Sequence, residues 1–148
     1  VTCYKVAHDF GCSDTVDIHI DDEGEVTSQF SKDMIWMFHV WSEIWTKRAD
    51  LGAGYDGWQV VDGTPTVTNY MFGFHGPTPV IAVKNEEMQK PYDVAFVYSE
   101  INADIIYWKL QGPNKPLKLI HTNATDTGQL IVTKAPGCCE REDLTDQY

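Results

Sequence analysis

The sequence predicts an α+β fold made mostly of antiparallel β-strands, with a few short helices. Two observations predict it. Short segments rich in β-branched and aromatic residues recur along the chain, and glycine, proline or acidic turn signals separate them. The chain has 148 residues, of which 43% are hydrophobic and 12% aromatic, enough for one domain with a packed core. We therefore expect residues 1–148 to belong to a single domain.

The expected elements follow from local patterns. Alternation of apolar and polar residues predicts a strand over 16–20, which an acidic Gly-containing turn would connect to a return strand. Residues 35–45 favour a strand by their aromatic and branched side chains, although a helix stays open as an alternative. Strands are expected over 16–20, 25–30, 35–45, 58–61, 95–98, 105–108, 117–121 and 130–134. Loops are expected over 49–57 and 73–79, a short helix over 80–87, and the start of a helix over 140–148.

Charge and hydropathy exclude several classes of partner. Eleven basic residues stand against 22 acidic ones, a net charge of -11, which argues against nucleic acid and anionic membrane surfaces. No stretch of about 18 apolar residues is present, so we expect no membrane span. The first residues carry no secretory signal, and the four cysteines form no zinc-binding pattern, so we expect free thiols in a reducing compartment.

A histidine and an aspartate are candidates for catalysis. His39 lies within the aromatic segment, and Asp62 ends the next expected strand. Two neighbouring strands can place such residues side by side, and a histidine base needs a carboxylate that accepts its ring proton and stabilises the imidazolium. The pattern alone leaves another reading open, in which His39 is a core histidine and Asp62 caps a turn.

Oxygen-bearing side chains form candidate cation ligands. They gather near the N-terminus, where close spacing allows them to surround a calcium ion, and a second pair lies between two expected strands. The alternatives are a solvated acidic loop for the first group and a plain turn for the second. The first group comprises Asp9, Ser13, Asp14, Thr15 and Asp17, with Asp33 downstream, and the pair is Asn102 and Asp104.

Several motifs resemble the catalytic core of the animal transglutaminases of the tissue, epidermal and factor XIII type. The segment over 32–41 reads KDMIWMFHVW, and the segment over 54–65 reads GYDGWQVVDGTP. Three further segments agree in the same order, namely AHD at 7–9, FVYSEINAD at 96–104 and REDLT at 141–145. The resemblance covers the chain from end to end, and it implies the C-terminal part of a papain-like core.

The resemblance implies specific roles. Transglutaminases use a Cys–His–Asp triad whose thiolate attacks a protein glutamine, releases ammonia and passes the acyl group to a lysine amine. His39 matches the catalytic histidine and Asp62 the triad aspartate, while Trp36 matches a tryptophan that lines the substrate tunnel and limits access of water. Calcium is the implied cofactor. Its implied ligands are Asp9, Ser13, Thr15 and Asp33 at one site, and Asn102 and Asp104 at another.

The departures from the family pattern are equally informative. The family nucleophile lies in a Gly-Gln-Cys-Trp motif, which this chain lacks, and Cys3 aligns with an asparagine. Gly11 falls where many members have an oxygen ligand, which weakens the first calcium site. We therefore expect the rest of the transglutaminase chain to carry the Cys-bearing segment and the flanking β domains. We expect the 148 residues alone to be inactive and to expose an apolar patch.

The alternative is a transglutaminase-like structural or binding protein without activity. The resemblance also implies protein glutamine and lysine substrates. We expect a cytoplasmic location, and export without a signal peptide is the alternative.

Overall fold

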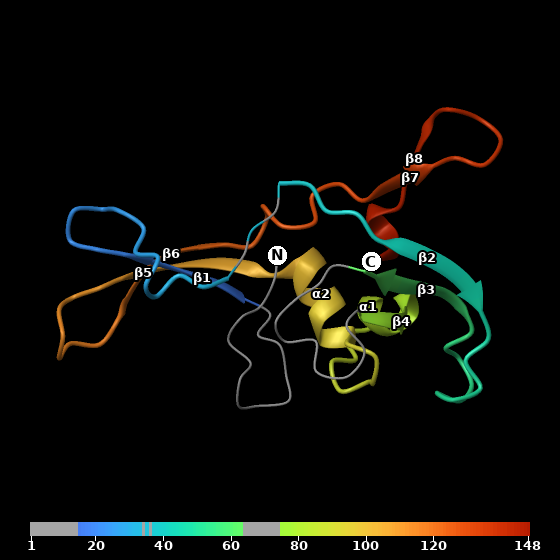
Figure 1. Cartoon of the computed structure of the whole chain (residues 1–148), viewed down its shortest axis with the longest axis horizontal. Helices are drawn as coiled ribbons and strands as arrows, with labels where there is room; N and C mark the ends of the chain where they lie inside the picture. The colour runs from blue at the N-terminus through green and yellow to red at the C-terminus, as the bar shows by residue number, and fades with distance from the viewer. Residues whose placement is uncertain (1–14, 34, 36, 64–74) are drawn as a thin grey trace.

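The structure, a computed structural model, describes residues 15–33, 35, 37–63 and 75–148. Within these residues it contains two three-stranded sheets, two short α-helices and a C-terminal hairpin (Figure 1). In the first sheet β5 is central, parallel to β1 and antiparallel to β6. The strands of this sheet are β1 (Thr15–Ile20), β5 (Asp104–Lys109) and β6 (Lys118–Asn123).

The second sheet is antiparallel throughout and lies beside the helices. Its order is β2-β3-β4, so β3 is the central strand. The strands are β2 (Ser42–Thr46), β3 (Gly57–Asp62) and β4 (His75–Pro79). The remaining elements are α1 (Val80–Lys84), α2 (Val94–Asn102), β7 (Val132–Lys134), β8 (Arg141–Asp143) and the 3-10 helix η1 (Thr145–Gln147).

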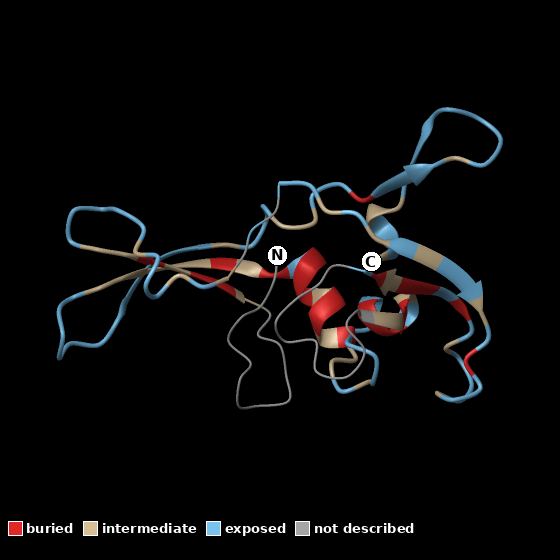
Figure 2. Ribbon diagram, in the orientation of Figure 1, coloured by how far each residue is buried: buried red, intermediate tan, exposed pale blue. Residues whose placement is uncertain are grey.

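The main core forms where α1 and α2 pack against the second sheet. Figure 2 shows buried residues concentrated on the helices and β3, whereas the outer ends of the hairpins are exposed. The buried core consists of Val60, Ala82, Val83, Val94, Phe96, Val97, Ile101 and Ile131. This core fixes the ends of β3 and α2 relative to each other, and both ends carry residues of the candidate site.

The predicted fold class is confirmed. The strands expected over 16–20, 58–61, 105–108 and 117–121 correspond to β1, β3, β5 and β6, and the expected helix corresponds to α1. Most strand pairs are antiparallel, with β1 and β5 forming a parallel pair. In the described part of the chain, no helix is long and apolar enough to cross a bilayer.

The strand prediction over 95–98 is wrong, because these residues lie inside helix α2. The β-branched and aromatic content favoured a strand, but Val94, Val97 and Ile101 are spaced three and four apart and are all buried. Ser99 is accommodated in the helix because its hydroxyl donates to the carbonyl of Ala95 at 2.8 Å. Tertiary burial of one helical face therefore outweighs the local β propensity.

The loop prediction over 73–79 is also wrong over 75–79, which form β4, while residues 73 and 74 lie outside the described residues. This strand contains two prolines, which lack an amide hydrogen and are tolerated at a sheet edge. The order β2-β3-β4 leaves β4 at the edge, with Gln59 facing Pro79 and Val60 facing Thr78 across the ladder.

The return strand expected over 25–30 reduces to a single bridge between Ile20 and Val26. Side chains supply part of the missing ladder, since the β1 amides of His19 and Asp17 donate to Ser31 Oγ and Asp33 Oδ2, each at 2.8 Å.

Two other predictions need correction. The strand expected over 35–45 begins only at Ser42, and residues 140–148 contain a short strand and a 3-10 turn instead of an α-helix.

Candidate active site

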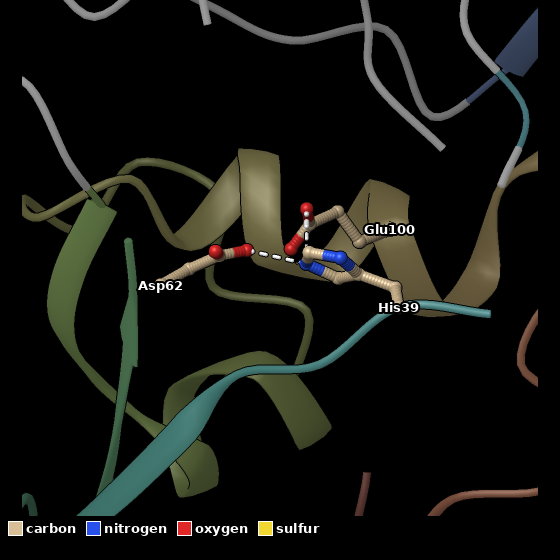
Figure 3. A group of neighbouring side chains, drawn as sticks. All are labelled: His39, Asp62 and Glu100. Carbon is tan, nitrogen blue, oxygen red and sulfur yellow. Dashed lines mark hydrogen bonds and ion pairs between the residues drawn. The ribbon is translucent and has the colours of Figure 1, made fainter. Parts of the chain in front are cut away.

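His39 and Asp62 form a direct hydrogen bond. His39 Nε2 lies 2.7 Å from Asp62 Oδ2, and the Asp62 side chain is fully buried, while that of His39 is 15% exposed (Figure 3). Asp62 is the last residue of β3, as expected. His39 does not lie on a strand, because β2 begins three residues later at Ser42. The predicted pairing is therefore present, but an irregular segment that leads into β2 presents the histidine.

Glu100 completes the cluster and was missed in the sequence. It lies in α2, is 2% exposed at its side chain, and places Oε1 3.2 Å from His39 Nε2 (Figure 3). Nε2 carries one hydrogen, which Asp62 accepts, so the Glu100 contact is an ion pair with the protonated ring. Glu100 falls on the same face as Val97, and a carboxylate on the buried face of an apolar helix was the available signal.

The electrostatics favour a protonated imidazole. Burial by itself lowers the pKa of His39, but the hydrogen bond to Asp62 and the contact with Glu100 outweigh burial and raise it from 6.5 to about 9. Burial raises the pKa of Glu100 to about 7, although the contact with His39 opposes that shift. At neutral pH the ring is therefore an imidazolium facing a buried aspartate.

The cluster opens onto a cavity of about 1100 Å³. His39, Glu100, Trp41 and Trp58 are among its lining residues, so the ring is accessible to a reactant from this side. Next to the histidine, Phe38 is 90% exposed and other apolar side chains are similarly open. Both Asp62 and Glu100 contact the Nε2 side of the ring.

The expected calcium ligands that the structure describes lie on β1 and β5 of the first sheet or on segments next to them. Thr15, the first residue of β1, is the register partner of Asp104, the first residue of β5. Asn102 ends α2 two residues before Asp104, and Asp33 is bonded to the β1 amide of Asp17 at 2.8 Å. Hydroxyl, amide and carboxylate oxygens are ligands that calcium accepts, so this donor chemistry fits the ion.

Other expected site residues lie outside the described part of the chain, namely Trp36, Asp9 and Ser13. Among the described residues, the group of His, Cys, Asp or Glu donors within 4.8 Å of one another is His39, Asp62 and Glu100, and it includes none of the expected calcium ligands. Cys138 and Cys139 are free and exposed in the turn between β7 and β8, and neither lines the cavity at His39. They are therefore not placed to act as its nucleophile.

Comparison with known proteins identifies the relatives of this chain. No protein-family model matches. The chain is 48% identical to annulin of Schistocerca americana and 40% identical to human protein-glutamine gamma-glutamyltransferase K, covering all of this chain but 20% and 18% of those proteins. Chicken protein-glutamine gamma-glutamyltransferase 2 is also 40% identical, with 21% of its length covered.

A solved structure agrees with the sequence comparison. The red sea bream transglutaminase matches with a TM-score of 0.75 and 37% identity, over 92% of this chain and 20% of that one. The chain thus spans about one fifth of the length of the relatives it matches. By sequence and by fold, therefore, this chain is a homologue of the animal transglutaminases and corresponds to a segment of their length.

Proposed function

We propose that this chain is the His/Asp part of a calcium-dependent protein-glutamine γ-glutamyltransferase. In this proposal a cysteine from the rest of the protein, outside these 148 residues, enters the cavity beside His39. The observation that carries the proposal is the 2.7 Å hydrogen bond between His39 Nε2 and the fully buried Asp62, with the ring open to the cavity. The 148 residues alone lack this cysteine and are expected to be inactive.

In the proposed chemistry, the ring of His39 donates and accepts the protons that move in each step. The imidazolium of His39 pairs through its Nδ1 hydrogen with the cysteine thiolate, while Asp62 accepts the Nε2 hydrogen. The thiolate attacks the γ-carboxamide carbon of a protein glutamine, and His39 donates a proton to the leaving nitrogen, which departs as ammonia. This step leaves a thioester and a neutral imidazole.

The second half of the reaction restores the cysteine thiolate and the His39 imidazolium. A lysine ε-amine attacks the thioester carbon, and His39 takes its proton while the sulfur leaves as thiolate. The product is an isopeptide bond between the glutamine and lysine side chains. Water in place of the amine would give glutamate, so an apolar wall around the cavity favours transfer to the amine. The exposed apolar residues beside His39, and Trp36 by family resemblance, are candidates for that wall.

Calcium would be held at two sites. Thr15 and Asp33 would supply hydroxyl and carboxylate oxygens at one site, with Asp9 and Ser13 as further expected ligands, and Asn102 and Asp104 would supply amide and carboxylate oxygens at the other. A bound calcium would supply positive charge next to the C-terminal end of α2. Glu100 belongs to the same helix as Asn102, so this helix connects the proposed calcium ligands with the His39 cluster.

The decisive experiment uses the full-length protein. We expect it to incorporate a labelled primary amine into a glutamine-bearing protein, to release one ammonia per amine incorporated, and to stop when calcium is chelated. A His39→Ala variant should lose incorporation, whereas His121→Ala, at an exposed position on β6, should retain it. Folded, calcium-loaded wild-type protein that incorporates no amine would instead indicate a binding or structural protein.

A further inference from the structure

A hydrogen-bonded group next to the active-site cluster links three residues that the proposed chemistry does not use. Trp41 lies two residues after His39, Glu43 belongs to β2, and Tyr148 follows η1. Figure 1 shows the C-terminal turn, in red, beside the start of β2. The C-terminal residue Tyr148, more than 100 positions away in the sequence, therefore contacts the start of β2, just after the segment that carries His39.

Hydrogen bonds and ring contacts connect Glu43 and Tyr148 to His39 through Trp41. Trp41 Nε1 donates to Tyr148 Oη at 3.0 Å, and Tyr148 Oη donates to Glu43 Oε1 at 2.5 Å. The Trp41 and Tyr148 rings pack edge to face with centroids 5.7 Å apart. On its other side the Trp41 ring lies 5.8 Å from the imidazole of His39, tilted by 39°. The indole is thus held by Tyr148 and packs against the catalytic ring.

Tyr148 is itself well anchored. Its ring and that of Trp41 pack on the main core together with Leu144. The amide of Leu144 donates to the carbonyl of Ile131 at 2.8 Å, which attaches the C-terminal turn to the buried part of the chain. Burial, with the hydrogen bond to Glu43, also raises the pKa of Tyr148 well above its usual range, so its hydroxyl remains a donor throughout the physiological range.

We propose that Tyr148, Trp41 and Glu43 act as positioning residues that hold the His39 ring at the angle it needs for proton transfer. The inference rests on the proposed function, since it assigns these residues a part in that reaction. His39 lies on an irregular segment that leads into β2, and the side chains of Asp62, Glu100 and Trp41 contact its ring. Asp62 and Glu100 hold Nε2 from one side, and the indole limits rotation of the ring from another.

The test uses Tyr148→Phe in the full-length protein, which removes the hydroxyl and keeps the ring. We expect kcat for ammonia release from a glutamine peptide to fall about tenfold with KM unchanged, because a misaligned ring slows proton transfer without changing substrate contacts. Tyr107→Phe on β5 of the other sheet is the matched control and should keep the wild-type kcat. Equal kcat values for the two variants would overturn the inference.

Glu43 provides a second, independent arm. Glu43→Leu removes the acceptor and should lower kcat as Tyr148→Phe does, whereas Glu43→Gln keeps an oxygen that accepts from Tyr148 and should restore most of it. The double variant Tyr148→Phe/Glu43→Leu should be no slower than either single variant, since both act through Trp41. Additive losses, or a Glu43→Gln variant as slow as Glu43→Leu, would contradict the network. If Tyr148→Phe does not fold, these Glu43 variants decide the question.

A spectroscopic arm separates failure of this inference from failure of the proposed function. In ¹⁵N-histidine-labelled full-length protein, Tyr148→Phe should shift or broaden the imidazole signals of His39, and Tyr107→Phe should not. Wild-type protein without transferase activity would reject the proposed function alone, because the NMR result would still report on the ring. Active wild-type protein with unchanged His39 signals in Tyr148→Phe would reject the positioning role alone.

Discussion

Replacing Asp62 with asparagine tests the electrostatic role of the buried carboxylate. The substitution keeps the size of the side chain but removes the negative charge 2.7 Å from His39 Nε2. In the wild-type structure the pKa of His39 is raised from 6.5 to about 9 against the opposing effect of burial. A shift of this size corresponds to about 3 kcal/mol in favour of the imidazolium. The hydrogen bond to Asp62 is the largest single contribution to the rise, and Glu100 adds to it, so part of this preference should disappear in Asp62→Asn.

The assay is the pH profile of kcat/KM for ammonia release by the full-length protein. In the wild type, the basic limb should reflect loss of the imidazolium near pH 9. In Asp62→Asn the limb should move toward neutral pH, and kcat should fall on the order of 10³-fold because the ring also loses its orientation. Asp22→Asn, on an exposed side chain, is the control. A variant at position 62 with the wild-type profile would refute the reasoning.

Four further predictions concern the surroundings of this pair. Glu100→Gln should lower kcat less than Asp62→Asn, because its carboxylate lies 3.2 Å from Nε2 and does not accept the ring hydrogen; an equal or larger loss would contradict this order. Arg48→Lys should destabilise the protein by about 2–4 kcal/mol, since the buried guanidinium bonds Gln59 and the carbonyl of Pro77 at 2.7 and 2.6 Å. Thermal unfolding against the exposed Arg141→Lys measures the loss. Asp104→Ala should raise the calcium concentration for half-maximal activity about tenfold, unlike Asp126→Ala. Protonation of His39 should stabilise the fold fully below pH 6.5 and lose this effect as pH rises through about 9, so the Tm difference between wild type and His39→Gln should shrink over that range.

Local patterns in the sequence predicted the sheets better than the helices. The alternation over 16–20 and the aromatic and branched residues over 58–61 and 105–108 correspond to strands, although in β1 the polar Asp17 and His19 are buried together with Val16. Helix α2 was missed because its residues have high β propensity, and only the packing against α1 and the second sheet selects the helix. Strand β4 was missed because its prolines indicate a loop unless the neighbouring strand is known.

The candidate site could also be predicted only in part from the sequence. The pairing of His39 and Asp62 could be predicted, since a family motif surrounds each residue and β3 places the aspartate at its end. Glu100 could not be assigned to the pair, because its contact depends on how α2 packs across the second sheet. The Tyr148 contact joins residues more than 100 positions apart, a separation at which a single sequence carries no pairing signal.

The most direct test of the central claim is an NMR titration of histidine in the full-length protein. With ¹⁵N-labelled histidine, and with His39→Gln to assign the signal, we expect the His39 ring to keep both protons up to about pH 9 and to hold the Nε2 hydrogen in a strong bond to Asp62. A His39 ring that loses its proton near pH 6.5, or a titration unchanged by Asp62→Asn, would contradict it.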